Sequence, residues 1–339
     1  MTTTRRVALP RLLIGIVISA AFLALVIARV NLGEVAAAVR GANLTLLAIA
    51  LIVVLGVDLF IRAARWRVLL AAILPDPPGI PRAAAWLSIG YMANTILPAR
   101  LGDVARAYLA GSSFGAARLA TLGTVLVERV SDGLMMVALL LVSSVLVAGF
   151  GQVRDLQTQS VIIMLLVIVG FVGLGAAWLV LTRGPLARIR SATMLRHLLN
   201  RMAIGAAALG SLRGAALVAG LTIAAATTAS LVSGLVTSSL GLALTPVEVV
   251  LFTSGIALSL AIPTAPGNLG TLEFAGVLIL TAFGASAEVG LAAILLVRLV
   301  TTIPLALMGV VVTVATDMRP SAMFSVASAE GSTDAGVTT

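Results

Sequence analysis

Residues 44–61 read LTLLAIALIVVLGVDLFI, an apolar run whose single charged residue is Asp58. As a helix, this run spans about 27 Å, close to the hydrocarbon thickness of a lipid bilayer. The whole chain has the same character, because 60% of its 339 residues are hydrophobic and only 10% are charged. In soluble domains, roughly a quarter of all residues are charged. The sequence therefore predicts an all-α, polytopic integral membrane helical bundle.

The residue types that the chain lacks exclude most enzyme chemistries. It has no cysteine, which excludes disulfides, thiolate metal sites and cysteine nucleophiles. All 22 basic residues are arginine, which excludes Schiff-base and P-loop lysines. With His197 as the single histidine, neither a histidine metal site nor a catalytic triad is expected. We therefore expect no metal, no cofactor and no direct use of ATP.

The net charge of +9 is concentrated in three short arginine-rich segments, residues 5–11, 62–82 and 183–201. Short basic loops of membrane proteins face the cytoplasm. The basic charge therefore indicates topology and contact with anionic headgroups, and we expect no nucleic-acid partner. This orientation predicts a multi-pass plasma-membrane protein with both termini in the cytoplasm.

Six apolar runs are long enough to cross the membrane and agree with this orientation: 12–28, 44–61, 133–149, 160–182, 215–242 and 289–315. They predict one transmembrane domain over residues 1–318. The following residues, 319–339, are rich in Ser, Ala, Gly and Thr and are expected to be disordered.

Two further apolar regions are too short or too broken to be simple spans. As a helix, Ala83–Leu97 would be roughly 22 Å long, so residues 83–128 must enter the membrane from the cytoplasmic side and return. The region 249–283 is interrupted by Pro263 and Pro266 and must enter from the opposite side. We therefore expect two re-entrant hairpins of opposite orientation.

The two broken regions resemble each other in sequence. Pro98-x-x-Leu-Gly102-Asp103 is followed by Arg129, and Pro266-Gly267-x-Leu-Gly270-x-x-Glu273 is followed by Arg298. The arginine comes 31 residues after the first proline and 32 after the second. This pattern is typical of an inverted-repeat transporter with a midplane site, although so short a match also arises by chance.

Charged residues inside apolar runs are the candidates for a polar pathway, because unpaired charges in hydrocarbon are costly. The alternative is a set of structural ion pairs, such as Arg129 with Glu273 or Arg298 with Glu128. Arg100, Asp103 and Arg106 are spaced for one helical face, but on spacing alone a solvated cytoplasmic cluster explains them slightly better. Asp58 is expected to pair with Arg62 at i,i+4, and residues 62–67 read as an interfacial patch.

These motifs resemble, in the same order, the transmembrane flippase-like region of lysylphosphatidylglycerol synthases over residues 10–318. The resemblance implies transport or accommodation of phospholipids or polyprenyl-linked lipids. Asp103 departs from the glutamate that is common in the family, with its charge kept. We expect no aminoacyl-transferase domain here. The following positions would line the lipid path or belong to the broken helices beside it: Asn94, Pro98, Arg100, Gly102, Asp103, Arg106, Glu128, Arg129, Asp132, Pro263, Pro266, Gly267, Gly270, Glu273 and Arg298.

The leading hypothesis is therefore a non-enzymatic translocase for a phosphate-bearing lipid, with proton coupling through Glu128, Asp132 or Glu273 left open. One alternative is a membrane transferase in which a carboxylate acts as general base. Another is a non-catalytic scaffold for a separately encoded lipid-modifying enzyme. Self-association into a homo-oligomer is compatible with each of them.

Overall fold

A computed structural model of the chain describes residues 20–28, 30–97, 101–149, 202–260 and 266–316, and every regular element in these ranges is a helix. This confirms the predicted all-α class. The elements are α2 (Leu32–Gly41), α3 (Leu44–Val53), the π-helix η1 (Val54–Asp58), α4 (Leu59–Ala71), α5 (Ile80–Ile96), α6 (Leu101–Phe114), α7 (Arg118–Gly149), η4 (Ile204–Gly210), α10 (Leu212–Ser239), α11 (Pro246–Ser259), η5 (Pro266–Asn268), α12 (Thr271–Ala282), α13 (Ala287–Val300) and α14 (Thr302–Ala315).

Four helical stretches in the described part of the chain are long and apolar enough to cross a membrane: Leu44–Ala71, Arg118–Val147, Leu212–Ser239 and Ala287–Ala315. A fifth is obtained if Ala20–Ile27 and α2, bent by 84°, form one span. Four of the six predicted spans thus have helical counterparts, and only residues 20–28 of the predicted span 12–28 are described. The predicted span 160–182 and the tail 319–339 lie outside the described residues.

The first of these spans begins where the sequence predicts and ends later. Asn43 caps it, because its Oδ1 accepts a hydrogen bond from the Thr45 N–H at 3.0 Å. The helix continues through η1 into α4 and therefore carries Arg62 and Arg65 inside the bundle. The expected interfacial patch is wrong, since Arg65 and Trp66 are 2% and 0% exposed.

Helix α7 corrects the expected boundary at Asp132. The sequence predicts that the hairpin region ends at residue 128 and that the next span begins at 133, whereas α7 is continuous from Arg118 to Gly149. The acidic and basic residues in its first half do not interrupt it because each has an ion-pair partner on another helix. The helices of the first predicted hairpin are therefore α5 and α6, which pack against each other.

The last predicted span is two consecutive helices, α13 and α14, separated at Thr301. Pro304 explains the separation, because proline has no N–H for the carbonyl four residues earlier and its ring clashes with that carbonyl. The helix ahead of it therefore ends at Val300.

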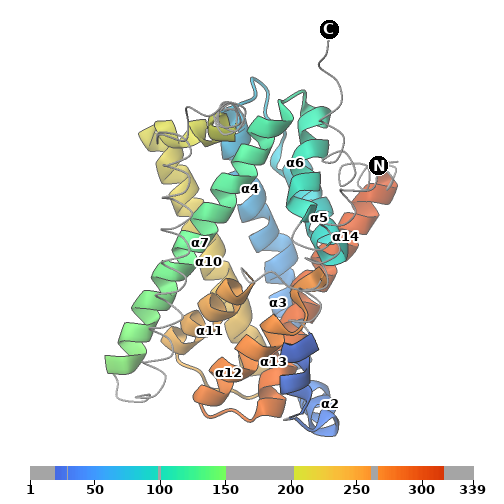
Figure 1. The fold of residues 1–339 in the computed structure, drawn as a ribbon, viewed down its shortest axis with the longest axis vertical. Helices are drawn as coiled ribbons and strands as arrows, with labels where there is room; N and C mark the ends of the chain where they lie inside the picture. The colour runs from blue at the N-terminus through green and yellow to red at the C-terminus, as the bar shows by residue number, and fades with distance from the viewer. Residues whose placement is uncertain (1–19, 29, 98–100, 150–201, 261–265, 317–339) are drawn as a thin grey trace, which may run out of the picture.

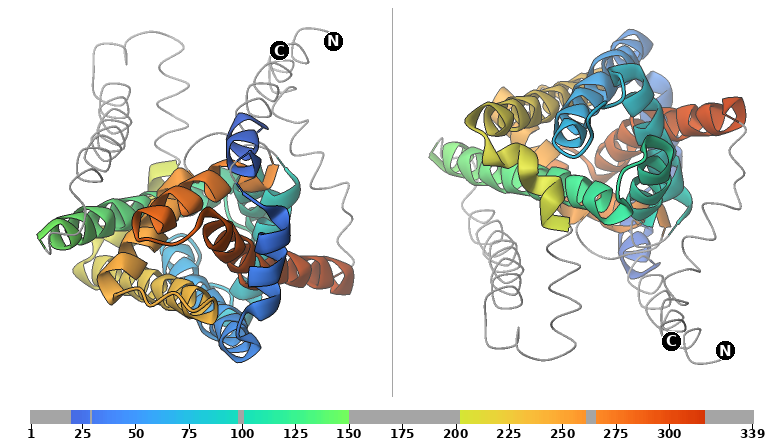
Figure 2. Two further views of the ribbon diagram at one scale, coloured as in Figure 1. Left: turned by 90° about the horizontal axis from the view of Figure 1, so that it is seen from below. Right: turned by 90° about the horizontal axis from the view of Figure 1, so that it is seen from above.

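The two hairpins lie in opposite halves of the elongated molecule, as predicted. In Figure 1, α5 and α6 occupy the upper half, whereas α11 and α12 occupy the lower half. Helices α7 and α10 lie on the other side of the bundle from α5, α6 and α14 (Figures 1 and 2). The described ends of the two hairpins meet: a Cβ at Gly267 of η5 would lie 3.9 Å from the Thr95 carbonyl oxygen of α5.

Helix α14 packs closely against α5 at Gly309. A Cβ at this position would meet the Ser88 backbone and lie 2.7 Å from the Met92 Cβ. We expect Gly309→Leu to lower the free energy of unfolding by about 1–3 kcal/mol, because the helices cannot separate locally to admit the side chain. Thermal unfolding in detergent measures this. Gly220→Leu is the matched control, since nothing lies within 4 Å of that Cβ.

Candidate functional site

A cavity of about 320 Å³ lies at the middle of the bundle, where the turns of the two hairpins meet α4, α7 and α10. One part of its wall is apolar and comes from α10, α11, α12 and α14. The other part is polar, with Asp58, Arg62, Tyr91, Asn94, Arg129 and Arg298. Of the charged residues predicted for the site, Arg129 and Arg298 line the cavity, and Asp58, Arg62 and Tyr91 line it as well.

Arg129 is held by the first hairpin and remains open to the cavity. Its Nε donates to Asp103 Oδ2 at 2.8 Å and its Nη2 donates to Oδ1 at 2.6 Å. Asn94 Nδ2 also donates to Asp103 Oδ1, at 3.2 Å. The carboxylate therefore fixes the plane of the guanidinium, while 34% of the Arg129 side chain stays exposed.

Asp103 of α6 comes close to α5, the other helix of the first hairpin, because the neighbouring Gly102 has no side chain. A Cβ at Gly102 would lie 2.6 Å from the Gly90 carbonyl oxygen and 2.6 Å from Asn94 Oδ1. Only glycine therefore allows α6 to approach α5 this closely. The expected solvated cluster at residues 100–106 is wrong, since Asp103 is 9% exposed and Arg106 is 2% exposed.

Arg298 has a different role, because all three of its guanidinium nitrogens are occupied. Its Nε donates to Glu273 at 2.7 Å, while Nη1 and Nη2 donate to the carbonyls of Gly267 and Asn268 at 2.7 and 2.8 Å. Irregular backbone at membrane depth needs such partners. Arg298 is therefore a clamp on the turn of the second hairpin and offers little to a ligand.

Glu273 and the backbone of this turn complete the clamp. Glu273 Oε2 accepts from the Gly270 N–H at 2.7 Å, which caps the start of α12. Gly267 and Gly270 have φ values of 72° and 91°, in the left-handed region that glycine tolerates. The backbone of Pro266 lies in the same turn, while Pro98, Arg100 and Pro263 lie outside the described residues.

The pairing within each half supports the predicted internal repeat. In both hairpins an acid in the first turn of the second helix, Asp103 or Glu273, binds the arginine that follows about two dozen positions later. The ion pairs that we considered between the halves, Arg129 with Glu273 and Arg298 with Glu128, are wrong. The expected pair of Asp58 and Arg62 is confirmed, with Arg62 Nε 2.7 Å from Asp58 Oδ2.

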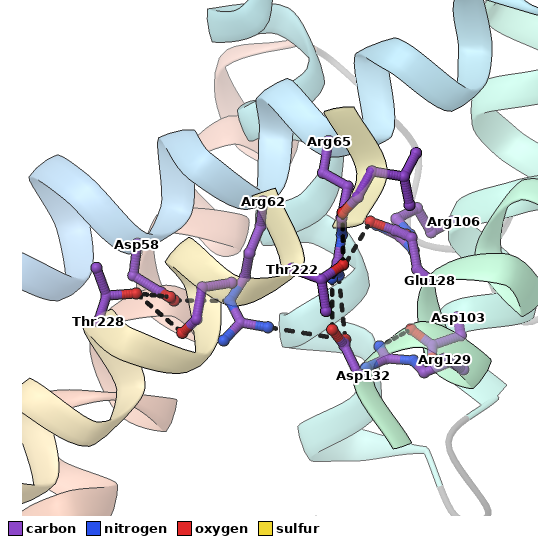
Figure 3. Close-up of polar contacts among 12 residues, drawn as sticks. Asp58, Arg62, Arg65, Asp103, Arg106, Glu128, Arg129, Asp132, Thr222 and Thr228 are labelled. Atoms are coloured by element: carbon purple, nitrogen blue, oxygen red, sulfur yellow. Dashed lines mark hydrogen bonds and ion pairs between the residues drawn. The ribbon is translucent and has the colours of Figure 1, made fainter. Parts of the chain in front are cut away.

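A ladder of alternating charges continues from Arg62 away from the cavity (Figure 3). Asp132 contacts Arg62 at 3.9 Å and also accepts hydrogen bonds from both terminal nitrogens of Arg65. Glu128 follows, 3.7 Å from Arg65 Nη2 and 2.7 Å from Arg106 Nη2. Glu128 and Asp132 thus share one face of α7, as their spacing of four residues predicts.

The sequence comparison adds a family to this geometry. A scan against protein families matches residues 12–309 to the family described as lysylphosphatidylglycerol synthase TM region. The chain belongs to this family. The resemblance drawn from the motifs is therefore confirmed, and the match covers every element that lines the cavity. No curated protein matches the chain.

Within this lysylphosphatidylglycerol synthase TM region, the described residues contain no group of three or more acidic, histidine or cysteine side chains that could hold a metal ion. What the cavity offers is cationic. Arg62 and Arg129 face it beside a single lining carboxylate, Asp58, and hydroxyl and amide groups surround them. Arginine binds phosphate with two parallel hydrogen bonds, so a phosphate is the ligand that this chemistry fits best.

The clamp makes a prediction about Arg298. We expect Arg298→Lys to resemble Arg298→Gln, because one ammonium group on a different stem cannot reach Glu273 and both carbonyls in the planar geometry of a guanidinium. Each variant should lower the free energy of unfolding by about 2–4 kcal/mol, since buried carbonyls lose their partners. Thermal unfolding measures this, and wild-type stability of the lysine variant would contradict the clamp. Arg213→Lys, an exposed arginine on α10, is the control.

Proposed function

We propose that the chain translocates a phosphate-bearing lipid, a phospholipid or a polyprenyl-linked lipid, whose headgroup binds at Arg129 in the cavity. The observation that carries the proposal is the state of Arg129. Two of its nitrogens are fixed by Asp103, yet a third of its side chain is exposed to a cavity at mid-depth. Membership of a lipid-related membrane family supports the same conclusion.

The two walls of the cavity suit an amphipathic substrate. The headgroup contacts Arg62, Arg129 and Tyr91, whereas apolar side chains of α10 and α11, such as Val232 and Ile256, face the first carbons of the acyl or prenyl chain. A preformed binding site with fixed donors costs little reorganisation when the phosphate arrives. The tails remain in the bilayer while the headgroup crosses.

The state of the carboxylates favours transport over a transferase reaction. Glu128, Asp132 and Glu273 each accept hydrogen bonds or ion-pair contacts from arginine. A general base must contact the proton that it removes, whereas each of these carboxylates already contacts an arginine and would have to give up that partner. We propose on this ground that the protein is not an enzyme.

The two ends of the elongated molecule differ in charge, which supports a cytoplasmic location for the end at which α4 and α14 finish. Among the described residues, the basic end is defined by Arg67, Arg82, Arg118 and Arg213 against Asp76, and it contains the starts of α5, α7 and α10. The opposite end carries Glu34, Glu248 and Glu288 against Arg40. By the positive-inside rule we propose that the basic end faces the cytoplasm of a plasma membrane, with anionic headgroups as its lipid partners.

The direct test is lipid translocation in proteoliposomes of defined composition that contain a trace of fluorescent phosphatidylglycerol. Dithionite quenches the outer-leaflet probe, so a translocase exposes more than half of the fluorescence to quenching. We expect quenching well beyond half with the wild type and about half with empty liposomes or with Arg129→Ala combined with Glu273→Ala. Equal quenching by the wild type and this double variant would overturn the site assignment.

A further inference from the structure

A cluster of four charges, three of them buried, lies between the cavity and the basic end. Two arginines from different helices, Arg65 of α4 and Arg106 of α6, are paired with Glu128 and Asp132 of α7. Arg65, Arg106 and Glu128 are only 2–3% exposed. The cluster has no net charge, and it crosses the interface between the first hairpin and the long helices (Figure 3).

The order of contacts along α10 shows where this cluster lies relative to the cavity and the basic end. Thr222, near the start of α10, accepts a hydrogen bond from Arg65 at 3.0 Å. Two turns later Thr228 donates to Asp58 at 2.8 Å, and Ala229 and Ser233 then line the cavity. Because α10 begins at the basic end, the cluster lies between that end and the cavity. A polar substrate moving from the cavity to the basic end must pass it.

Toward the opposite end, α3 and α10 present apolar side chains next to the cavity. One turn beyond the lining residues Val54 and Ser233 are Ala50 and Val236. Both are fully buried in the apolar core. The buried ion pairs of the cluster lie instead on the side of the basic end.

Two features make the cluster suited to a transient opening. Arg62 belongs both to the cavity and to the ladder, and its contact with Asp132, at 3.9 Å, is the longest of the ion pairs. In addition, Arg65 Nε and Arg106 Nε are buried with no hydrogen-bond partner. Buried N–H donors are costly to leave unpaired, so the cluster has spare capacity to bind a passing anion.

We propose that Arg65, Arg106, Glu128 and Asp132 form a gate between the cavity and the basic end, and that its ion pairs separate to let the headgroup pass. In the closed state the opposite charges neutralise each other, and the ion pairs block the path. When α7 moves relative to α4, the arginines exchange their carboxylates for the phosphate. The proposal rests on the proposed function, but the position and closure of the gate are testable without any transport.

The natural absence of cysteine allows a direct accessibility test. Ala229→Cys places a single thiol in the cavity, and a membrane-impermeant charged methanethiosulfonate is added from one side of sealed vesicles. Asp76→Cys and Thr245→Cys report the basic and the opposite end. We expect the cavity thiol of the otherwise unchanged protein to react from the basic end much more slowly than the thiol at position 76.

Opening the gate should accelerate this reaction. We expect Asp132→Asn in the Ala229→Cys background to raise the labelling rate from the basic end at least about tenfold, because Arg62 and Arg65 lose a shared partner. Should that variant fail to fold, Arg65→Gln with Asp132→Asn removes one positive and one negative charge together and carries the same expectation. Arg67→Gln, an exposed arginine on the same helix, is the matched control and should leave the rate unchanged.

Either of two results would overturn the gate. One is rapid labelling of the cavity thiol from the basic end before any gate residue is changed. The other is an unchanged rate in a folded gate variant. Failure of the proposed function is a separate result, because vesicles that translocate no lipid can still show slow labelling that the gate variants accelerate.

Discussion

Proteoliposomes that contain Arg129→Gln together with Asp103→Asn should translocate the phosphate lipid at less than about a tenth of the wild-type rate. The pair of substitutions removes Arg129, one of the cationic groups that face the cavity, together with its carboxylate, so no buried charge is left without a partner. One charge-assisted hydrogen bond is worth about 1.5–3 kcal/mol, which corresponds to at least tenfold in rate if it acts in the limiting step.

Two further variants separate ligand binding from charge alone. Arg118→Gln removes another arginine of α7, which stacks on Tyr108 far from the cavity lining, and should leave translocation intact. Arg129→Lys keeps the positive charge but cannot donate two parallel hydrogen bonds to Asp103 and still reach a phosphate, so we expect a clear loss of rate. Full activity of the charge-neutral double variant would show that the headgroup binds elsewhere.

The second large effect concerns stability. Glu128→Leu leaves Arg106 without its ion-pair partner in a position that is 2% exposed. Removing one member of a buried ion pair costs about 3–5 kcal/mol, because the remaining charge stays buried and uncompensated. We therefore expect a marked drop in the melting temperature in detergent, read by the loss of monodisperse protein after heating.

Replacing the whole pair provides the contrast. Glu128→Leu with Arg106→Leu removes both charges. It also removes the stacking of the Arg106 guanidinium on the Trp66 ring, whose centroid is 4.5 Å away. We expect this double variant to recover much of the lost stability, since buried ion pairs add little compared with apolar packing. A single Glu128→Leu variant as stable as the wild type would contradict the buried position of the pair. Glu248→Leu, at the capping box of α11, should cost about 1 kcal/mol.

The sequence was sufficient for the class of fold and for the hairpins. Runs such as 44–61 give helices whose length matches the thickness of a bilayer, and the arginines of the loops indicate one consistent orientation. The boundary of α7 was less accessible, because charges at Glu128, Arg129 and Asp132 read as the end of an apolar span. Their partners on α4 and α6 allow the helix to continue, and periodicity does not reveal such tertiary pairs.

The candidate site was predicted in outline and missed in detail. The repeated motif identified Asp103, Arg129, Glu273 and Arg298, but it did not show that one arginine faces the cavity and the other clamps a turn. Arg65 and Trp66 read as an interfacial anchor because arginine next to tryptophan is typical of such anchors. The signal that could have corrected this is Asp58, whose charge within the first apolar run already required a buried partner.

The central claim is that a phosphate headgroup binds in the midplane cavity at Arg129. The most direct measurement is an experimental structure of the wild-type protein in nanodiscs of phosphatidylglycerol. We predict headgroup density between the two hairpins, with phosphate oxygens within hydrogen-bond distance of the Arg129 guanidinium, and Arg298 still bonded to Gly267 and Asn268. A dry, closed helix interface at this position, with lipid headgroups ordered only at the ends of the bundle, would contradict the account.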